Sequence, residues 1–105
     1  MKFGIIGAGK MGSAIGLGVI KSNLFKKEDV IFADSYIPRI EELNSLGYKT
    51  LSNVELYQNA DIVLLAVKPQ QINVILEELS KVKDHAKTIT LICCGLTASK
   101  TISAF

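Results

Sequence analysis

Residues 7–12 read GAGKMG and match the pattern G-x-G-x-x-G, which is typical of a loop that binds a pyrophosphate. Gly7 permits a tight turn, and Gly9 has no Cβ, so a phosphate can approach the backbone. Gly12 allows the following helix to pack close to the sheet. The anion would rest on unpaired N–H groups at the positive end of that helix. The alternative is a tight turn that binds nothing, but the predicted strand before the loop and helix after it favour binding.

A carboxylate stands where such domains place an acid. Asp34 follows the apolar run 30–33 (VIFA), about 20 residues beyond the glycine loop. There it would accept hydrogen bonds from the adenosine ribose hydroxyls and repel a 2′-phosphate, which favours NAD over NADP. Ser35 and Arg39 follow and are suited to hold a phosphate, so both cofactors remain candidates. The other interpretation of Asp34 is a cap on the turn before the next helix.

Residues 66–69 (AVKP) form a third candidate segment, at the end of the apolar run 62–67. Ligands of doubly wound sheets lie beyond the carboxyl ends of the strands, so backbone groups here would line the path of the cofactor. Pro69 lacks an N–H and stiffens the turn. Lys68 is either a phosphate or substrate contact or a solvated turn lysine, and Lys10 either adds charge near the phosphates or is simply exposed.

These segments are positioned by an alternation of strand-like and helix-like segments. Apolar runs predict strands at 2–6, 30–33, 49–51, 62–67 and 88–93. Apolar spacings of three and four predict helices at 11–21, 38–46 and 72–82, with a short helix or turn at 53–58 capped by Asn53 and a last helix from Ala98 after Thr97. The alternation predicts one α/β domain, a Rossmann-like doubly wound parallel sheet in three α/β/α layers spanning residues 1–105.

Composition sets limits on function. Of the 105 residues 49% are hydrophobic and 21% charged, which is typical of a folded domain rather than a disordered segment. A formal net charge of +2 is too small to indicate a nucleic-acid or acidic-membrane partner. Apolar runs fall short of the ~18–20 residues that cross a bilayer. We therefore expect neither nucleic acid nor membrane as a partner.

The cysteines and the histidine offer little reactive chemistry. Cys93 and Cys94 are adjacent, a geometry that rarely allows a disulfide, so we expect a reduced, cytoplasmic setting. They follow the last predicted strand and are interpreted as small packing residues near the cofactor rather than nucleophiles. His85 lies in a polar stretch typical of a solvated loop. We therefore predict no catalytic residue in this chain. Metal-ligand spacing is absent from the sequence, so we also predict no metal site.

Three segments together resemble the N-terminal domain of pyrroline-5-carboxylate reductases. They are residues 4–12 (GIIGAGKMG), 59–70 (NADIVLLAVKPQ) and 93–97 (CCGLT), and the A-V-K-P-Q run is the most specific. Members of that family use NAD(P)H to reduce 1-pyrroline-5-carboxylate to L-proline, the last step of proline biosynthesis. By position, the resemblance implies cofactor contacts at Ile6, Gly7, Ala8, Gly9, Lys10, Met11, Asp34, Asn53, Ala66, Val67, Lys68, Pro69, Ile92, Cys93 and Cys94.

The chain departs from the family pattern at two places. Residues 34–36 (DSY) stand where members commonly have Ser or Arg to hold a 2′-phosphate, which keeps NAD and NADP both open. Cys93 and Cys94 stand where two alanines are usual. Both cysteines are small, so we expect the pocket to be retained.

The resemblance also implies a second, helical domain that binds the imino acid and builds a homo-oligomer, none of which falls within these residues. We therefore expect a fragment that is inactive alone. Three alternatives stay open: the nucleotide domain of another NADP-linked reductase of the F420-linked or β-hydroxyacid type, a stand-alone dinucleotide sensor, and an α/β domain that binds nothing. The turn at 68–69 weighs against the first, and the helix that begins just before the chain ends weighs against the second.

Overall fold

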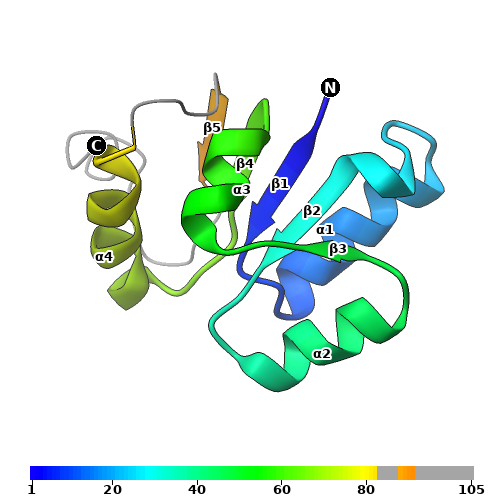
Figure 1. The fold of residues 1–105 in the computed structure, drawn as a ribbon, viewed down its shortest axis with the longest axis horizontal. Helices are drawn as coiled ribbons and strands as arrows, with labels where there is room; N and C mark the ends of the chain where they lie inside the picture. The colour runs from blue at the N-terminus through cyan, green and yellow to red at the C-terminus, as the bar shows by residue number, and fades with distance from the viewer. Residues whose placement is uncertain (83–87, 92–105) are drawn as a thin grey trace.

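A five-stranded parallel sheet forms the centre of the molecule in the computed structural model, which describes residues 1–82 and 88–91 (Figure 1). Its strands are β1 (Phe3–Ile6), β2 (Val30–Ala33), β3 (Lys49–Thr50), β4 (Ile62–Leu65) and β5 (Thr88–Leu91). The helices are α1 (Lys10–Lys21), α2 (Ile37–Ser45), α3 (Asn53–Asn59) and α4 (Pro69–Ser80), with a short 3-10 helix, η1 (Lys27–Asp29), before β2. The predicted α/β alternation and parallel sheet are confirmed.

The strand order β3-β2-β1-β4-β5 places a change of direction at the middle of the sheet. The chain builds outward from β1 to β3 and then returns to the other side of β1 to form β4 and β5. Ile5 of β1 therefore pairs with Phe32 of β2 on one side and with Leu64 of β4 on the other. In open parallel sheets a ligand crevice forms at such a switch point, beyond the carboxyl ends of the strands.

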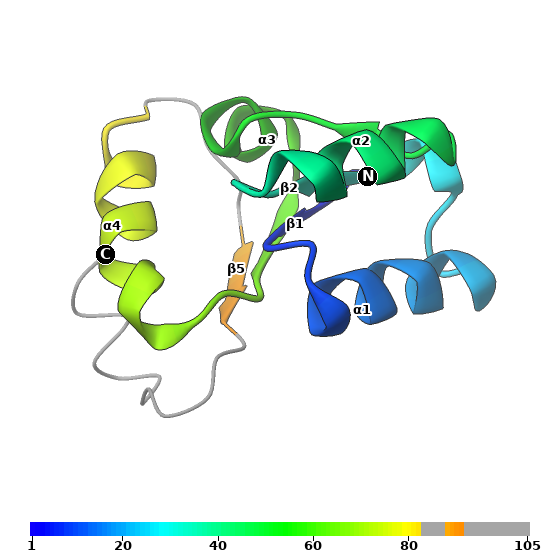
Figure 2. The same ribbon diagram turned by 90° about the horizontal axis from the view of Figure 1, so that it is seen from below.

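Two hydrophobic clusters hold the layers together, one on each face of the sheet. Successive strand residues point to opposite faces, so β1, β2 and β4 each contribute to both clusters. Beneath α1 and α2 the fully buried strand residues are Ile5, Val30 and Phe32, and beneath α3 and α4 they include Ile6, Ile31, Val63 and Leu65. Figures 1 and 2 show α1 and α4 on opposite sides of the strands. The continuous apolar runs of the sequence are explained by this double cover.

The N-terminal cap of α3 differs from the prediction. The cap is Ser52, not Asn53, which is the first helical residue. The Ser52 hydroxyl accepts a hydrogen bond from the Glu55 N–H (3.2 Å) and donates one to Glu55 Oε1 (2.9 Å). A glutamate three residues after a serine favours the serine as cap because it completes this reciprocal pair.

Several element boundaries also differ from the predicted ones, most of them by one or two residues. Helix α4 begins at Pro69, earlier than the predicted residue 72, and β4 ends at Leu65 rather than at residue 67. Proline fits the first turn of a helix, where its missing N–H is not needed. The predicted helix from Ala98 and its cap Thr97 lie outside the described residues.

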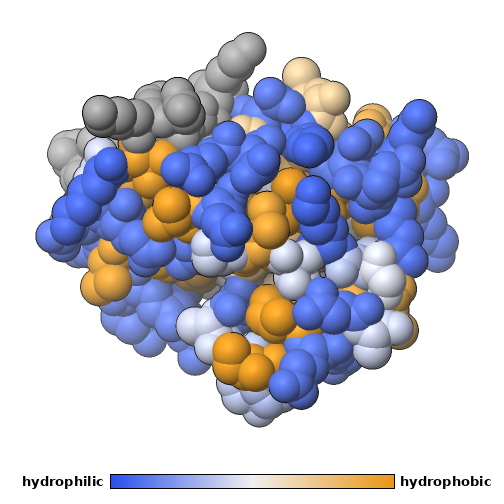
Figure 3. All heavy atoms as spheres, in the orientation of Figure 1, coloured by the Kyte–Doolittle hydropathy of each residue, from blue (hydrophilic) through white to orange (hydrophobic). Residues whose placement is uncertain are grey.

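The face drawn in Figure 3 is mostly hydrophilic, with hydrophobic residues in several separate patches. Among the residues that the structure describes, there is no helix with the length and apolar character needed to cross a membrane.

Helix α1 approaches the sheet closely at Gly16. A Cβ at this position would lie 2.5 Å from Cζ of Phe32 and 2.8 Å from Cδ1 of Ile5, both fully buried residues. At Gly18, in the same helix, a Cβ would meet no described atom within 4 Å. The two glycines therefore differ in packing while sharing one helix.

We predict that Gly16→Ala lowers the free energy of unfolding by about 1–3 kcal/mol, because the added methyl overpacks the core. Gly18→Ala is the matched control and should raise it by about 0.5–1 kcal/mol, because alanine favours the helix without a clash. Urea denaturation of both variants measures the difference. Equal effects of the two substitutions would contradict the packing of α1 on β1 and β2.

Candidate functional site

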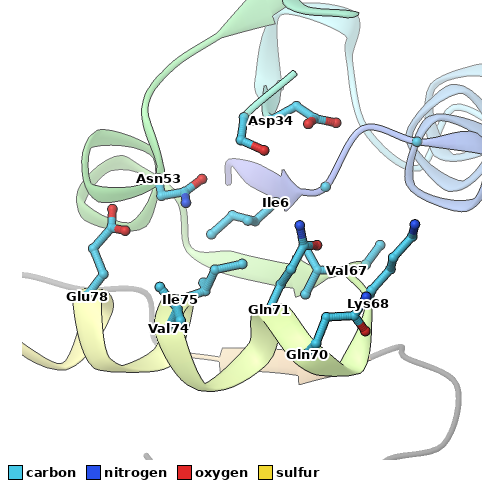
Figure 4. A pocket seen from close by; sticks show the side chains of 14 residues that line it. Ile6, Asp34, Asn53, Val67, Lys68, Gln70, Gln71, Val74, Ile75 and Glu78 are labelled. Atoms are coloured by element: carbon cyan, nitrogen blue, oxygen red, sulfur yellow. The ribbon is translucent and has the colours of Figure 1, made fainter. Parts of the chain in front are cut away.

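A pocket of about 490 Å³ opens where β1, β2 and β4 end, at the switch point of the sheet (Figure 4). Its volume lies within the range of about 300–1,000 Å³ found for small-molecule sites. Backbone hydrogen bonds keep the strand ends together beyond the strands themselves. The Gly7 N–H donates to the Ala33 carbonyl (2.8 Å), and the Ala66 N–H donates to the Ile6 carbonyl (2.9 Å). The pocket floor is therefore tied to the sheet.

Most of the residues predicted from the sequence meet at this pocket. Its lining includes Ile6, Gly7, Gly9, Asp34, Ser35, Asn53, Ala66, Val67 and Lys68. Ala8, Lys10, Met11 and Pro69 do not line it: Ala8 is fully buried, and Lys10 and Met11 are exposed on α1. Cys93 and Cys94, with Ile92, lie outside the described residues. Contact between any of these residues and a ligand stays a prediction.

Sequence reasoning missed the wall that α4 contributes. Gln70, Gln71, Val74, Ile75 and Glu78 line the pocket, all from this helix. Figure 4 shows them on one side of the pocket and Asp34 and Asn53 on the other. Their spacing of four, from 70 to 74 to 78 and from 71 to 75, places them on one helix face. This periodicity, together with the expected ligand position beyond β4, is the sequence feature that could have predicted the α4 side of the pocket.

The glycine loop has no room for side chains at two of its positions. Gly7 has a φ of +100°, and a Cβ there would collide with the Ala66 carbonyl oxygen. A Cβ on Gly12 would collide with the carbonyl oxygen of Gly7. At Gly9, by contrast, a Cβ would meet no described atom within 4 Å, and the residue is exposed at the pocket. The loop is thus tight toward the sheet and open toward the pocket, as an approaching phosphate requires.

The N-terminus of α1 is left available for an anion. The Ser13 N–H donates to the Gly9 carbonyl (2.9 Å), so the amides before it have no partner within the helix. In the described part of the chain no side chain caps this end, and no acidic residue stands in its first turn. Helix α3, in contrast, is capped by Ser52. Free amides and the positive end of the helix dipole at an open pocket fit a pyrophosphate.

Asp34 joins the end of β2 to the glycine loop. Its Oδ2 accepts a hydrogen bond from the Ala8 N–H (2.8 Å), and its Oδ1 accepts one from the Tyr36 N–H (2.9 Å). The second bond confirms the interpretation of Asp34 as a cap on the turn before α2. The half-buried carboxylate also lines the pocket, so it retains a surface for a ligand. A role toward ribose stays a prediction.

These features together fit a nicotinamide dinucleotide. A sequence profile described as "NADP oxidoreductase coenzyme F420-dependent" matches residues 2–94. The chain belongs to this family. The family description names NADP, one of the two cofactors that the sequence predicts.

Relatives of the chain carry the name that the sequence resemblance implied. The pyrroline-5-carboxylate reductase of Methanosarcina acetivorans is 36% identical over 100 residues, which are 93% of this chain and 37% of the relative. The enzyme of the same name from Aquifex aeolicus is 35% identical over 101 residues, 95% of this chain and 36% of the relative. The crystal structure of Plasmodium falciparum pyrroline carboxylate reductase with NADP bound matches with a TM-score of 0.81 and 27% identity, covering 99% of this chain and 37% of that one.

The resemblance to pyrroline-5-carboxylate reductases is confirmed by these matches. The family description also names coenzyme F420, the class that the sequence left open as an alternative, whereas these relatives are named for pyrroline carboxylate. The chain spans little more than a third of the length of these relatives.

We predict that Gly12→Ala lowers the free energy of unfolding by about 3 kcal/mol or more, because the methyl would force the Gly7 backbone to move. Gly9→Ala should cost about 1 kcal/mol at most, the penalty of alanine at a helix N-cap. Chemical denaturation compares the two. A Gly12→Ala variant as stable as Gly9→Ala would contradict the loop geometry.

Proposed function

We propose that this chain is the dinucleotide-binding domain of a pyrroline-5-carboxylate reductase, which reduces 1-pyrroline-5-carboxylate to L-proline with NADH or NADPH. One observation carries the proposal: a pocket brings together the uncapped glycine loop and the Ala66, Val67 and Lys68 segment that follows β4. Relatives of that name match more than nine-tenths of the chain, which supports the same substrate.

Each part of the pocket has a task in this proposal. A bound reduced nicotinamide supplies the hydride. The free amides of the glycine loop bind the pyrophosphate, and the carboxylate of Asp34 accepts hydrogen bonds from the adenosine ribose. Backbone groups of Ala66 and Val67 line the route toward the nicotinamide. The chain's own residues thus bind and orient the donor and move no proton.

The acceptor side of the reaction belongs to a second domain in this proposal. The resemblance implies a helical domain that holds the imino acid and builds a homo-oligomer, and the chain spans 37% of the Methanosarcina relative. Hydride transfer requires donor and acceptor to be held in reacting geometry. We therefore propose that residues 1–105 form only the NAD(P)-binding domain. This segment binds the dinucleotide but does not catalyse the reduction by itself.

The proposal also covers the location of the protein and its partners. The adjacent cysteines support a reducing, cytoplasmic location. The formal net charge of +2 supports the absence of a nucleic-acid partner. The full-length protein is proposed to be a homo-oligomer.

We predict that Gly9→Ala weakens binding of both NADH and NADPH by about tenfold or more, because a methyl enters the space that the pyrophosphate needs. Gly18→Ala, at the other end of α1, is the control and should leave both affinities unchanged. Isothermal titration with each dinucleotide gives the values. Unchanged affinity of Gly9→Ala would contradict the loop as the phosphate site, and no affinity of the parent chain would indicate a domain that binds nothing.

The substrate is tested by assay. The full-length protein should oxidise NADH or NADPH with 1-pyrroline-5-carboxylate as the acceptor, and it should not reduce NAD or NADP with a β-hydroxy acid as the donor. Residues 1–105 alone should show no proline formation above background, because the acceptor is not held. Proline formation by this segment alone would contradict the proposal that a second domain holds the imino acid. A preference for a hydroxy acid would contradict the proposed substrate.

A further inference from the structure

We infer that Glu78 makes this protein select dinucleotides whose base is adenine, by accepting a hydrogen bond from the exocyclic amino group of that base. The inference rests on the proposed function, because it requires the pocket to take a nicotinamide dinucleotide. It concerns the pocket wall formed by α4, to which the proposed function gives no task.

The Glu78 carboxylate lines the pocket without a partner in the described part of the chain. None of residues 1–82 and 88–91 forms an ion pair or a side-chain hydrogen bond with it. Asp34, the other acid of the described lining, already accepts a backbone N–H on each of its oxygens. An ionised carboxylate offers acceptor positions only, so the group that Glu78 binds in a ligand must be a hydrogen-bond donor.

The position of Glu78 along α4 decides which donor of a dinucleotide it can meet. The helix begins beside Lys68, where the backbone of Ala66 and Val67 lines the proposed route to the nicotinamide. At 1.5 Å per residue, Glu78 lies about 15 Å further along the helix axis than Lys68. Figure 4 shows it at the other end of the α4 wall, with its carboxylate pointing toward Asn53. The part of the dinucleotide that reaches this end is the base on the adenosine side of the pyrophosphate.

Apolar side chains for the flat face of the base lie between Gln71 and Glu78. Val74 and Ile75 line the pocket there, and Val74 is 67% exposed in the structure. The spacing of these four residues puts them on one face of the helix. A purine ring that lies against Val74 and Ile75 removes apolar surface from water. The polar edge of the same ring then faces the carboxylate that follows them on the helix.

Two purine bases differ at the edge that faces Glu78. Adenine carries an amino group at C6, and hypoxanthine carries a carbonyl oxygen at the same position. A carboxylate accepts a charge-assisted hydrogen bond from an exocyclic amino group, whereas a carbonyl oxygen gives it no donor and leaves both acceptors unpaired. Asn53, across the pocket, carries a donor and an acceptor and can turn its amide to suit either base. The discrimination is therefore assigned to Glu78.

The test compares dinucleotides that differ only in the base, on the full-length protein by isothermal titration. NADH and NADPH are each measured against their analogue with hypoxanthine in place of adenine. We expect the adenine form to bind about tenfold or more tightly, because a site that accepts an N–H from its ligand rejects an analogue without it. Glu78→Gln keeps the length of the side chain and adds a donor, so it should bring the two dissociation constants within about twofold of each other.

Two control variants separate recognition of the amino group from general charge and from contact with the ring. Glu77 is the adjacent acid on α4, exposed and outside the described lining, so Glu77→Gln removes the same charge and should leave the ratio of the two constants unchanged. An equal change in both glutamate variants would indicate a general charge effect and overturn the inference. Val74→Ala should weaken the adenine and hypoxanthine forms by the same factor, about threefold, because it removes apolar contact with a ring that both share.

The remaining outcomes separate the inference from the proposed function. Equal affinities for the two bases in the unmodified protein overturn the inference while leaving the proposed function intact, and this measurement needs no variant to fold. A preference for adenine that Glu78→Gln does not reduce overturns the assignment to Glu78. Unchanged affinities in Val74→Ala would place the base away from α4 and overturn it as well. Failure to bind any of these dinucleotides overturns the inference and the proposed function together.

Discussion

The contact between the start of α1 and the end of β1 is the constraint on which the rest of the site depends. Gly12 lies so close to the carbonyl of Gly7 that a methyl group does not fit between them. This approach aims the first turn of α1, with its unpaired amides, at the carboxyl edge of the sheet. Gly7 itself has a φ of +100°, a left-handed conformation that glycine tolerates. The proposed anion site is therefore formed by backbone amides rather than by charged side chains.

Asp34 extends this constraint to the second strand. By accepting the Ala8 N–H, it ties the loop to a residue 26 positions away in the sequence. The same carboxylate lines the pocket, and its proposed contact with the ribose would give one group two roles.

Much of this arrangement could be predicted from the sequence. The glycine pattern, the acid after β2 and the A-V-K-P segment are local signals, and the switch-point rule brings strand ends together without knowledge of side-chain packing. Helix periodicity located α4 but not its pocket face. Ile72, Leu76 and Leu79 form the buried stripe of that helix, and the residues beside the stripe line the pocket. The early start of α4 at Pro69 added Gln70 and Gln71 to the same face.

Other features depend on three-dimensional proximity that a linear pattern does not encode. The bond between Ala8 and Asp34 exists because β1 and β2 end side by side, and nothing in either residue alone predicts it. The cap of α3 was a different case, because the serine and glutamate at positions 52 and 55 were visible and a neighbouring asparagine competed for the role. Reciprocal pairing decides between two residues of similar capping strength.

A crystal structure of the protein with NADH tests the central claim most directly. The account predicts the diphosphate against the amides at the start of α1, with the adenosine ribose hydroxyls on the carboxylate of Asp34. A dinucleotide bound elsewhere, or a diphosphate that makes no contact with the amides of residues 9–12, would contradict it.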